Sequence, residues 1–473
     1  MDTKKLRQKI LDLAIHGKLV PQDPNDEPAS VLLERIRKEK EQLIKEGIIK
    51  APKKSKSAGD TSHYPKEVPF EVPEGWCWVT IGDVFLHNTG KALNSADRDG
   101  SPLSYITTSN LYWDRFELAN LKTMLFTEDE LEKCTARKGD LLVCEGGDIG
   151  RAAIWNQDYE IRIQNHIHKL RGLGGVNHRL FMFWLMYMKE EGMIGGKGIG
   201  LMGLSSRELD KLLIPLPPLC EQSRLVKNID GLLFVIGDIE NTETLLSKTV
   251  SSTKSRILDL AIHGKLVPQD PSDEPAIELL KRINPDFVPS DNLHYGNKLP
   301  SGWSCAIYGE LNQHKNKAGN PIECPDSSFE LYSVPIYETG YPEYLTGKEI
   351  GSTKQQVSKG DVLLCKINPH LNRVWIVSHY HPEKKCIASS EWLIFKSEAL
   401  LPEYARIFFM SPAFRDLMLS NVSGVGGSLM RARGSAIESY PIWVPPIKEQ
   451  KRIIDIVDSY NNVLDVIAAS IKE

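Results

Sequence analysis

An internal repeat constrains this chain more than any other feature of its sequence. The segment Ile10–Pro24, ILDLAIHGKLVPQDP, recurs unchanged at Ile257–Pro271, which lies 247 positions later. The match extends to 23 identities over the 27 positions from Ile10 to Ile36. Chance does not produce such agreement, so the chain contains a duplicated element, which we call element B.

A second repeat, element A, has a different offset. Residues Pro217–Gln222 align with Pro445–Gln450, 228 positions later. The order along the chain is therefore B, a variable region, A, B, a second variable region, A. This is a circular arrangement, in which the two chain ends together rebuild what the centre holds continuously.

The two variable regions are only weakly related and predict one ancestral domain that was duplicated and then diverged. Each opens with Pro-x-Gly-Trp, at Pro73–Trp76 and Pro300–Trp303, and each carries Lys-Gly-Asp before an apolar run ending in Cys144 or Cys365. Short apolar runs among turn residues predict mixed α/β domains. The strands are expected at 140–144, 152–155, 361–365 and 374–377, and later helices at 179–191 and 402–419.

Element A predicts a long helix of coiled-coil character, because its apolar residues alternate steps of three and four. The stripe consists of Leu225, Ile229, Leu232, Ile236 and Ile239, and of Ile453, Val457, Tyr460, Leu464 and Ile467 in the second copy. Element B predicts a short helix ending near Gly17 or Gly264, an extended link, and a second helix from Ala29 or Ala276. The first copy of that second helix is expected to continue through the charged residues 37–50.

These patterns together predict a mixed α/β chain with six segments and a pseudo-two-fold axis. The apolar stripe of element A would pack its helices on each other or on a partner. The predicted segments are 1–50 (element B), 51–65 (linker), 66–217 (first domain), 218–284 (elements A and B), 285–445 (second domain) and 446–473 (element A).

Composition narrows the class of protein further. With 473 residues the chain is long for one core. Its 58 basic and 62 acidic side chains give a net charge of -4, which by itself argues against a nucleic-acid-binding protein. Eight cysteines without a Cys-x-x-Cys spacing predict reduced thiols and no metal site. Without a signal peptide or a long apolar run, we expect a cytoplasmic protein with no membrane partner.

The chain resembles the specificity subunits of type I restriction–modification systems. The resemblance is carried by the Leu-Pro-Pro-Leu-x-Glu-Gln junction at Leu216–Gln222, its counterpart at Val444–Gln450, the repeated Ala-Ile-His-Gly-Lys-Leu-Val-Pro-Gln and the Pro-x-Gly-Trp openings. It implies two target-recognition domains that each read one half of a bipartite double-stranded DNA sequence. It also implies that long helices, forming an antiparallel coiled coil, separate the two domains, set the spacing and dock two methyltransferase subunits.

Catalysis, by this resemblance, belongs to the partners and not to this chain. S-adenosylmethionine is expected in the methyltransferase subunits, and ATP and Mg²⁺ in nuclease/translocase subunits. Residues 219–248, about 45 Å long if fully helical, could act as a ruler between half-sites about 34–36 Å apart.

Several motifs that suggest other functions do not carry them. Gly198–Gly203 fits G-x-G-x-x-G, but a helical pattern precedes it, so we discard a dinucleotide site and leave open a glycine loop near DNA or a plain loop. The Pro-Pro sites lack the polar and aromatic residues with which an amino-methyltransferase holds a flipped base. His166 and His168 lack a third ligand, so we interpret them as structural histidines.

DNA contacts are expected from Lys and Arg on phosphates and from Arg, Lys, Asn or Gln at base edges. Among the candidates, the glycine-flanked Arg151, Lys197, Arg431 and Arg433 are favoured. The full set is Lys91, Arg98, Tyr112, Arg115, Arg151, Asn165, His166, Lys169, Lys197, Lys315, Lys317, Lys366, Asn372, Arg373, Arg431 and Arg433.

Two other functions remain open at this point. One is a self-contained restriction endonuclease or methyltransferase with an unrecognised site. The other is a coiled-coil adaptor that binds only protein.

Overall fold

The computed structural model describes residues 2–49, 68–94, 98–194, 204–290, 298–315, 317–423 and 430–472. The expected linker at 51–65, the glycine motif at 198–203 and the candidate Lys197 lie outside these residues. The chain divides into two compact units, one covering Asp2–Thr242 and the other formed by Glu243–Glu473 with Met1. The boundary falls inside a single helix.

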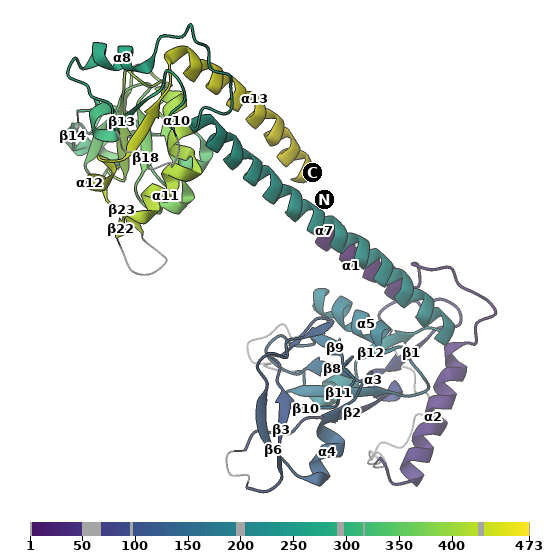
Figure 1. The fold of residues 1–473 in the computed structure, drawn as a ribbon. Helices are drawn as coiled ribbons and strands as arrows, with labels where there is room; N and C mark the ends of the chain where they lie inside the picture. Colours follow the sequence, from purple (N-terminus) through teal and green to yellow (C-terminus); the bar gives the residue numbers. More distant parts are fainter. Residues whose placement is uncertain are drawn as a thin grey trace. The chain divides into compact units, whose positions relative to one another are not determined.

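The first unit combines element B, the first variable region and nearly all of the first copy of element A (Figure 1). Its helices are α1 (Thr3–Ile15), α2 (Ala29–Lys45), α3 (Ile81–Val84), α4 (Glu128–Cys134), α5 (His178–Glu190), α6 (Ser206–Asp210) and the first part of α7 (Leu219–Ile262). Its strands are β1 (Cys77–Thr80), β2 (Phe85–Thr89), β3 (Ser101–Ile106), β4 (Leu111–Tyr112), β5 (Arg115–Phe116), β6 (Lys122–Phe126), β7 (Thr135–Ala136), β8 (Leu141–Cys144), β9 (Ala152–Ile154), β10 (Ile161–Ile163), β11 (Ile167–Gly172) and β12 (Leu213–Leu216).

The second unit has the same plan. Its helices are the end of α7, α8 (Ala276–Ile283), α9 (Tyr308–Leu311), α10 (Pro402–Met410), α11 (Pro412–Ser420), α12 (Gly434–Ile437) and α13 (Ile447–Lys472). Its strands are β13 (Ser304–Ile307), β14 (Ala318–Gly319), β15 (Ser328–Tyr332), β16 (Glu343–Thr346), β17 (Lys354–Gln356), β18 (Val362–Cys365), β19 (Val374–Ile376), β20 (Lys385–Ala388), β21 (Trp392–Phe395), β22 (Val422–Ser423), β23 (Arg431–Ala432) and β24 (Pro441–Val444).

Corresponding sheets build the two units. An antiparallel pair joins the start of each variable region to its end, as β1–β12 in the first unit and β13–β24 in the second. A sheet of order β2-β11-β8-β9 in the first unit corresponds to β19-β18-β21 in the second. The outer sheets differ, with order β6-β3-β10-β7 against β14-β17-β20-β15-β16. The mixed α/β fold predicted from the sequence is confirmed.

The repeat offsets explain the long helix. Helix α13 shifted back by 228 positions covers 219–244, and α1 shifted forward by 247 covers 250–262. Helix α7 is thus elements A and B fused through residues 245–249, and it runs for 44 residues rather than ending near residue 248. Every residue from 244 to 249 is exposed, so packing does not fix the length of this connecting segment of α7.

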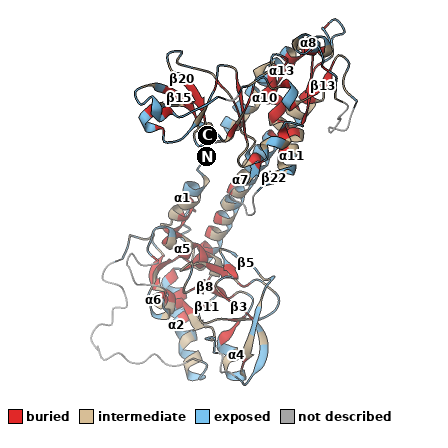
Figure 2. Cartoon of the chain, turned by 90° about the vertical axis from the view of Figure 1, so that its left-hand side faces the viewer, coloured by how far each residue is buried: buried red, intermediate tan, exposed pale blue. Residues whose placement is uncertain are grey.

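In each unit α7 lies antiparallel to a second helix, α1 in the first unit and α13 in the second, as expected. In the first unit, Arg7 of α1 pairs with Glu240 of α7 at 2.9 Å. In the second, the equivalent basic position Lys254 pairs with Asp465 of α13. Figure 2 shows the buried residues of the long helices concentrated where they meet a globular part.

Element B packs into the domain that follows it and is not a separate unit. One continuous core joins Ala14 of α1, Leu32 of α2, Trp184 of α5, Leu216 of β12 and Ile229 of α7. Helix α5 is buried on most sides, with Leu180 to Leu185 each at most 1 % exposed, which explains its nearly unbroken apolar sequence.

Three helix predictions need correction. The helix expected at 402–419 is two helices, because Pro412 holds Ser411 in an extended conformation with ψ of 148°. Helix α2 ends at Lys45, before the expected residue 50. On α7 the core stripe uses Leu233, whereas Leu232 is 39 % exposed, because the 3.6-residue helical repeat drifts away from a strict heptad.

The remaining stripe residues divide between the cores and the helix surfaces. Leu225, Ile229, Ile236, Ile453 and Val457 are buried, Ile239, Leu464 and Ile467 are intermediate, and Tyr460 is 51 % exposed.

Candidate nucleic-acid interface

The repeated motifs of the first unit meet at a buried polar joint, where α7 begins. Glu221 is 1 % exposed, and its carboxylate accepts hydrogen bonds from Trp76 Nε1 at 2.9 Å and Gln22 Nε2 at 2.8 Å. Burial raises the pKa of Glu221, and the two hydrogen bonds oppose that rise. Arg224 pairs with Asp26 at 2.5 Å. Element B and the domain opening are thereby tied to the start of α7.

The second unit repeats this joint contact by contact. Glu449 accepts from Trp303 Nε1 and from Gln269 Nε2, both at 3.0 Å. Arg452 pairs with Asp273 at 2.6 Å. The identical residues of elements A and B therefore serve the scaffold.

The glutamine of each junction links the long helix to the main domain helix. Gln222 is fully buried, accepts from the Asn177 backbone N–H at 2.9 Å and donates to the Pro217 carbonyl at 2.9 Å. Gln450 accepts from the Leu401 N–H at 2.8 Å and donates to the Pro445 carbonyl. Since Asn177 and Leu401 are the N-cap residues of α5 and α10, each bond fixes the start of that helix against the long helix of its own unit.

A short hairpin brings three of the predicted DNA-binding residues together in the first unit. Strands β4 and β5 pair Tyr112 with Arg115 across a two-residue turn. The Arg115 guanidinium lies 4.5 Å from the Tyr112 ring centroid, and the Arg151 guanidinium lies 5.0 Å from the same centroid. We call these three residues the hairpin cluster. Cation–π contacts of this kind order long side chains.

Arg151 supports this cluster from inside the domain. Its side chain is only 16 % exposed, donates to the Thr108 carbonyl at 2.8 Å and pairs with Asp148 at 3.3 Å. Arg115, by contrast, is exposed. The exposed arginine and Tyr112, which is 36 % exposed, form the face of the cluster, and Arg151 forms its base.

Arg373 occupies the corresponding position in the second unit. The backbone N–H of Cys144 bonds the Arg151 carbonyl at 2.8 Å, and that of Cys365 bonds the Arg373 carbonyl at 3.0 Å. Burial raises the pKa of both thiols, and the neighbouring arginine partly opposes each rise. Arg373 also donates to the Ile367 carbonyl at 3.0 Å. The Lys-Gly-Asp…Cys motif thus places one arginine at the same point of each domain.

Two lysine candidates are engaged inside the first unit. Lys169 is 2 % exposed and donates to the Glu132 and Thr135 carbonyls at 3.1 and 2.9 Å. Burial, followed by the charge of Arg171, lowers the pKa of Lys169 to about 8. Lys91 has a side chain 9 % exposed and pairs with Glu130 at 2.8 Å. Neither ammonium is presented on the surface, so the expectation of a DNA contact there is not supported by their positions.

The other candidates do not form one cluster with the hairpin. His166 has a side chain 56 % exposed and lies 3.2 Å from Glu145, whereas Arg431 pairs with Glu391 at 2.7 Å. Asn372 donates to the Met410 carbonyl at 2.6 Å. Exposed positions are held by Arg98, Lys315, Lys317 and Arg433, and intermediate ones by Asn165 and Lys366.

His168 takes a structural position. His168 is fully buried, and its Nδ1 lies 2.9 Å from His87 Nε2, whose other ring nitrogen lies 2.7 Å from Asp210. Burial and the neighbouring His87 lower the pKa of His168. Over the described residues, no group of three or more Cys, His, Asp or Glu side chains is arranged to hold a metal ion, and none of the eight cysteines forms a disulfide.

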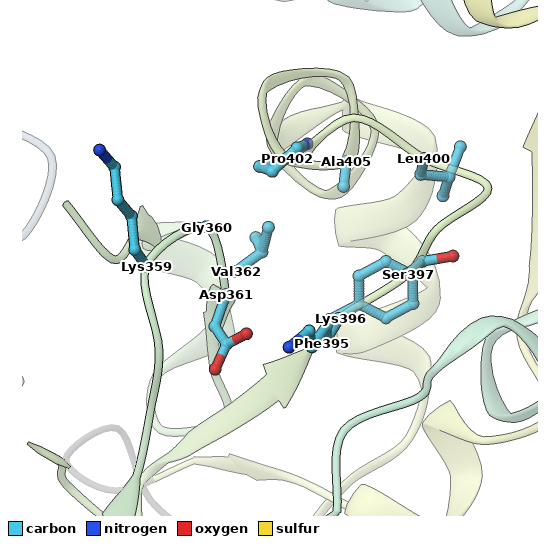
Figure 3. Close-up of a pocket in the computed structure, with 10 residues that line it drawn as sticks. All are labelled: Lys359, Gly360, Asp361, Val362, Phe395, Lys396, Ser397, Leu400, Pro402 and Ala405. Atoms are coloured by element: carbon cyan, nitrogen blue, oxygen red, sulfur yellow. The ribbon is translucent and has the colours of Figure 1, made fainter. Parts of the chain in front are cut away.

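The Lys-Gly-Asp motif of the second unit borders a small cavity of about 160 Å³ (Figure 3). Pro402, the first residue of α10, lines it. In the first unit the corresponding residue, His178, bonds the Gly139 carbonyl and accepts from the Gly172 N–H. The second unit thus has a proline where the first has this imidazole, and the cavity is smaller than the pockets that bind drug-sized ligands.

Sequence reasoning missed Arg179 and Asp114, which anchor the hairpin. Arg179 follows the start of α5, and Asp114 lies in the hairpin turn with φ of 57°. Their partnership spans 65 positions, and no local pattern indicates a contact at that separation.

The fold and these contacts define a class: duplicated two-domain proteins with a shared helical scaffold and divergent surfaces. A family model described as "Type I restriction modification DNA specificity domain" matches residues 73–245. The Escherichia coli type I restriction enzyme EcoEI specificity subunit is 27 % identical over 98 % of this chain and 89 % of its own length. The E. coli EcoAI specificity subunit is 31 % identical over 67 % of this chain and 64 % of its own.

A solved chain reported under "Structural basis underlying complex assembly and conformational transition of the type I R-M system" has the same fold. Its TM-score is 0.55 at 16 % identity, covering 85 % of this chain and 94 % of that one. The chain belongs to the type I restriction–modification specificity subunits. None of the helices in the described ranges has the length and apolar character needed to cross a membrane.

Proposed function

We propose that this chain selects the DNA target of a type I restriction–modification complex. Each globular unit reads one half of a bipartite double-stranded sequence, and the long helices set the spacing and dock two methyltransferase subunits. Methyl transfer with S-adenosylmethionine, and ATP- and Mg²⁺-dependent cleavage by nuclease/translocase subunits, belong to those partners.

The contrast between scaffold and surface carries this proposal. The joints at Glu221 and Glu449 agree in every hydrogen bond and ion pair described above. The surfaces differ around the equivalent arginines: Arg151 belongs to the aromatic hairpin cluster, whereas among the described residues Arg373 has no cation–π contact with an aromatic ring. Two domains that recognise different DNA sequences from one repeated helical scaffold need a scaffold that is the same in both copies and surfaces that differ.

The hairpin cluster has the chemistry for DNA contact. An exposed arginine can bind phosphate, or guanine through its two parallel N–H groups, and Tyr112 holds it in a limited range of orientations. Local cations of this kind reconcile a net charge of -4 with DNA binding.

The decisive experiment is co-expression of the chain with a methyltransferase subunit, followed by mapping of modified bases. We expect a two-part motif. Exchange of residues 66–217 for another recognition domain should alter one half and leave the other unchanged. Changes in both halves, or methylation or cleavage by the purified chain alone, would contradict the proposal.

A further inference from the structure

One arginine connects the hairpin cluster to the long helix. Arg179 Nη1 and Nη2 donate to the two carboxylate oxygens of Asp114, both at 2.7 Å. Its Nε lies 2.9 and 2.8 Å from the carboxylate oxygens of Asp230 on α7. The guanidinium therefore joins three elements, namely the hairpin, α5 and α7.

The contacts are well suited to holding the hairpin in place. Paired N–H donors restrict orientation as well as distance, and the Arg179 side chain that carries them is partly buried, with 32 % exposed. Burial disfavours its charged form, but the hydrogen bonds to Asp230 and Asp114 outweigh burial and raise the pKa of Arg179. The guanidinium stays charged at every accessible pH.

The hairpin turn has little freedom to move without its neighbours. Trp113 and Asp114 alone connect the paired residues Tyr112 and Arg115. Asp114 adopts a left-handed conformation that aspartate tolerates better than most residues. Displacing Asp114 must therefore displace Arg115, the exposed arginine of the cluster.

The second unit lacks this connection. The equivalent of Arg179, the second residue of α10, is Glu403, and the equivalent of Asp230, 228 positions later, is Asp458. Both are exposed acids, and among the described residues neither takes part in an ion pair. A carboxylate at position 403 cannot hold a second carboxylate.

We propose that Arg179 is a positioning residue that makes recognition of the first half-site depend on Asp230 of α7, with no counterpart in the second unit. The inference rests on the proposed function. It predicts an asymmetry: the same change on the two long helices affects one half of the DNA target and leaves the other alone.

The test uses the full complex with methyltransferase and three DNA duplexes. One duplex is cognate, one carries a substitution in the half-site assigned to residues 66–217, and one carries a substitution in the other half-site. Discrimination is the ratio of methylation rates on the cognate and each substituted duplex. The variants are Arg179→Met and Asp230→Asn, with Asp458→Asn as the matched control.

We expect Arg179→Met to reduce discrimination at the first half-site about tenfold and Asp230→Asn about threefold, since the amide keeps one acceptor. Discrimination at the second half-site should stay unchanged, and Asp458→Asn should behave as wild type at both. Arg179→Lys should fall between wild type and Arg179→Met, because an ammonium keeps the charge without the two-sided geometry.

Equal losses at both half-sites would show a general structural effect and overturn the proposal, as would full discrimination in all variants. If Arg179→Met does not fold, the pair Asp230→Asn and Asp458→Asn decides alone. The wild-type complex could discriminate at both half-sites while the variants keep full discrimination. That result refutes the positioning role of Arg179 and leaves the proposed function intact. A domain exchange that fails to change half of the motif refutes the function itself.

Discussion

If α7 sets the spacing between the two DNA half-sites, as proposed, residues 245–249 are the place where α7 can be lengthened without disturbing either unit. They belong to neither repeat, and the exposed fractions of Leu245 and Leu246 are 65 % and 38 %. Four helix-forming polar residues inserted after Ser247 lengthen α7 by about 6 Å and rotate one end against the other by about 40°. No buried contact is lost.

The expected effect on DNA follows from that geometry. A lengthening of about 6 Å corresponds to roughly two base pairs of rise, at about 3.4 Å each, and a rotation of about 40° to roughly one base pair of twist. The non-specific spacer between half-sites should grow by one or two base pairs, with both half-sites unchanged. Seven inserted residues add about 10.5 Å to α7 and rotate its end by about 20° in the opposite sense. They should lengthen the DNA spacer by about three base pairs.

Mapping of methylated motifs in cells that co-express the methyltransferase measures the spacer directly. The control is the same four-residue insertion after Gly231, which displaces the buried Ile236 from the first core and should abolish modification. An unchanged spacer after insertion at Ser247, or an altered half-site, would refute the idea that α7 sets the spacing.

Three further outcomes follow from the structure. Gln222→Met orphans the Asn177 N–H and the Pro217 carbonyl, so the free energy of unfolding should fall by about 2–5 kcal/mol in denaturant titrations. The pKa of Lys169 is lowered to about 8 in the folded chain, whereas the ordinary lysine pKa is about 10.4. Between these two pH values the unfolded chain binds more protons than the folded chain, so the free energy of unfolding should rise with pH by about 3 kcal/mol. Lys169→Met should lack this rise in parallel denaturant titrations at about pH 7 and 10.5. Arg115→Ala should reduce the slope of log affinity against log salt by about one in DNA-binding assays. An unchanged slope would rule out a phosphate contact by Arg115.

The duplicated scaffold could be read from the sequence because its signals are local. Gly17 and Gly264 have φ of 63° and 62°, the left-handed conformation that ends a helix and favours glycine. Identical sequence then predicted identical structure in both copies. The break before Pro412 was also readable, since a residue ahead of proline avoids the helical conformation, and the apolar pattern of residues 402–419 concealed it.

The site was less predictable because its residues depend on distant partners. Lys169 has the charge of a surface residue, yet β11 lies between β2 and β8 in its sheet, and neighbouring layers cover its side chain. Arg179 finds its two carboxylates 65 positions before and 51 positions after itself. Only the three-dimensional arrangement separates an arginine that contacts a ligand from one that holds another residue in place.

The two repeat offsets show why such a scaffold tolerates divergent readers. Element B recurs after 247 positions and element A after 228, so the second variable region is shorter by the difference, 19 residues. Despite that loss, the glutamine-to-glutamate bonds of the two joints measure 2.8 and 3.0 Å, and the arginine-to-aspartate pairs 2.5 and 2.6 Å. The joints therefore do not depend on what lies between them. Under the proposed function, a recognition domain can be lengthened, shortened or exchanged while the frame that presents it to DNA keeps its geometry, and connections such as that of Arg179 can arise in one copy alone.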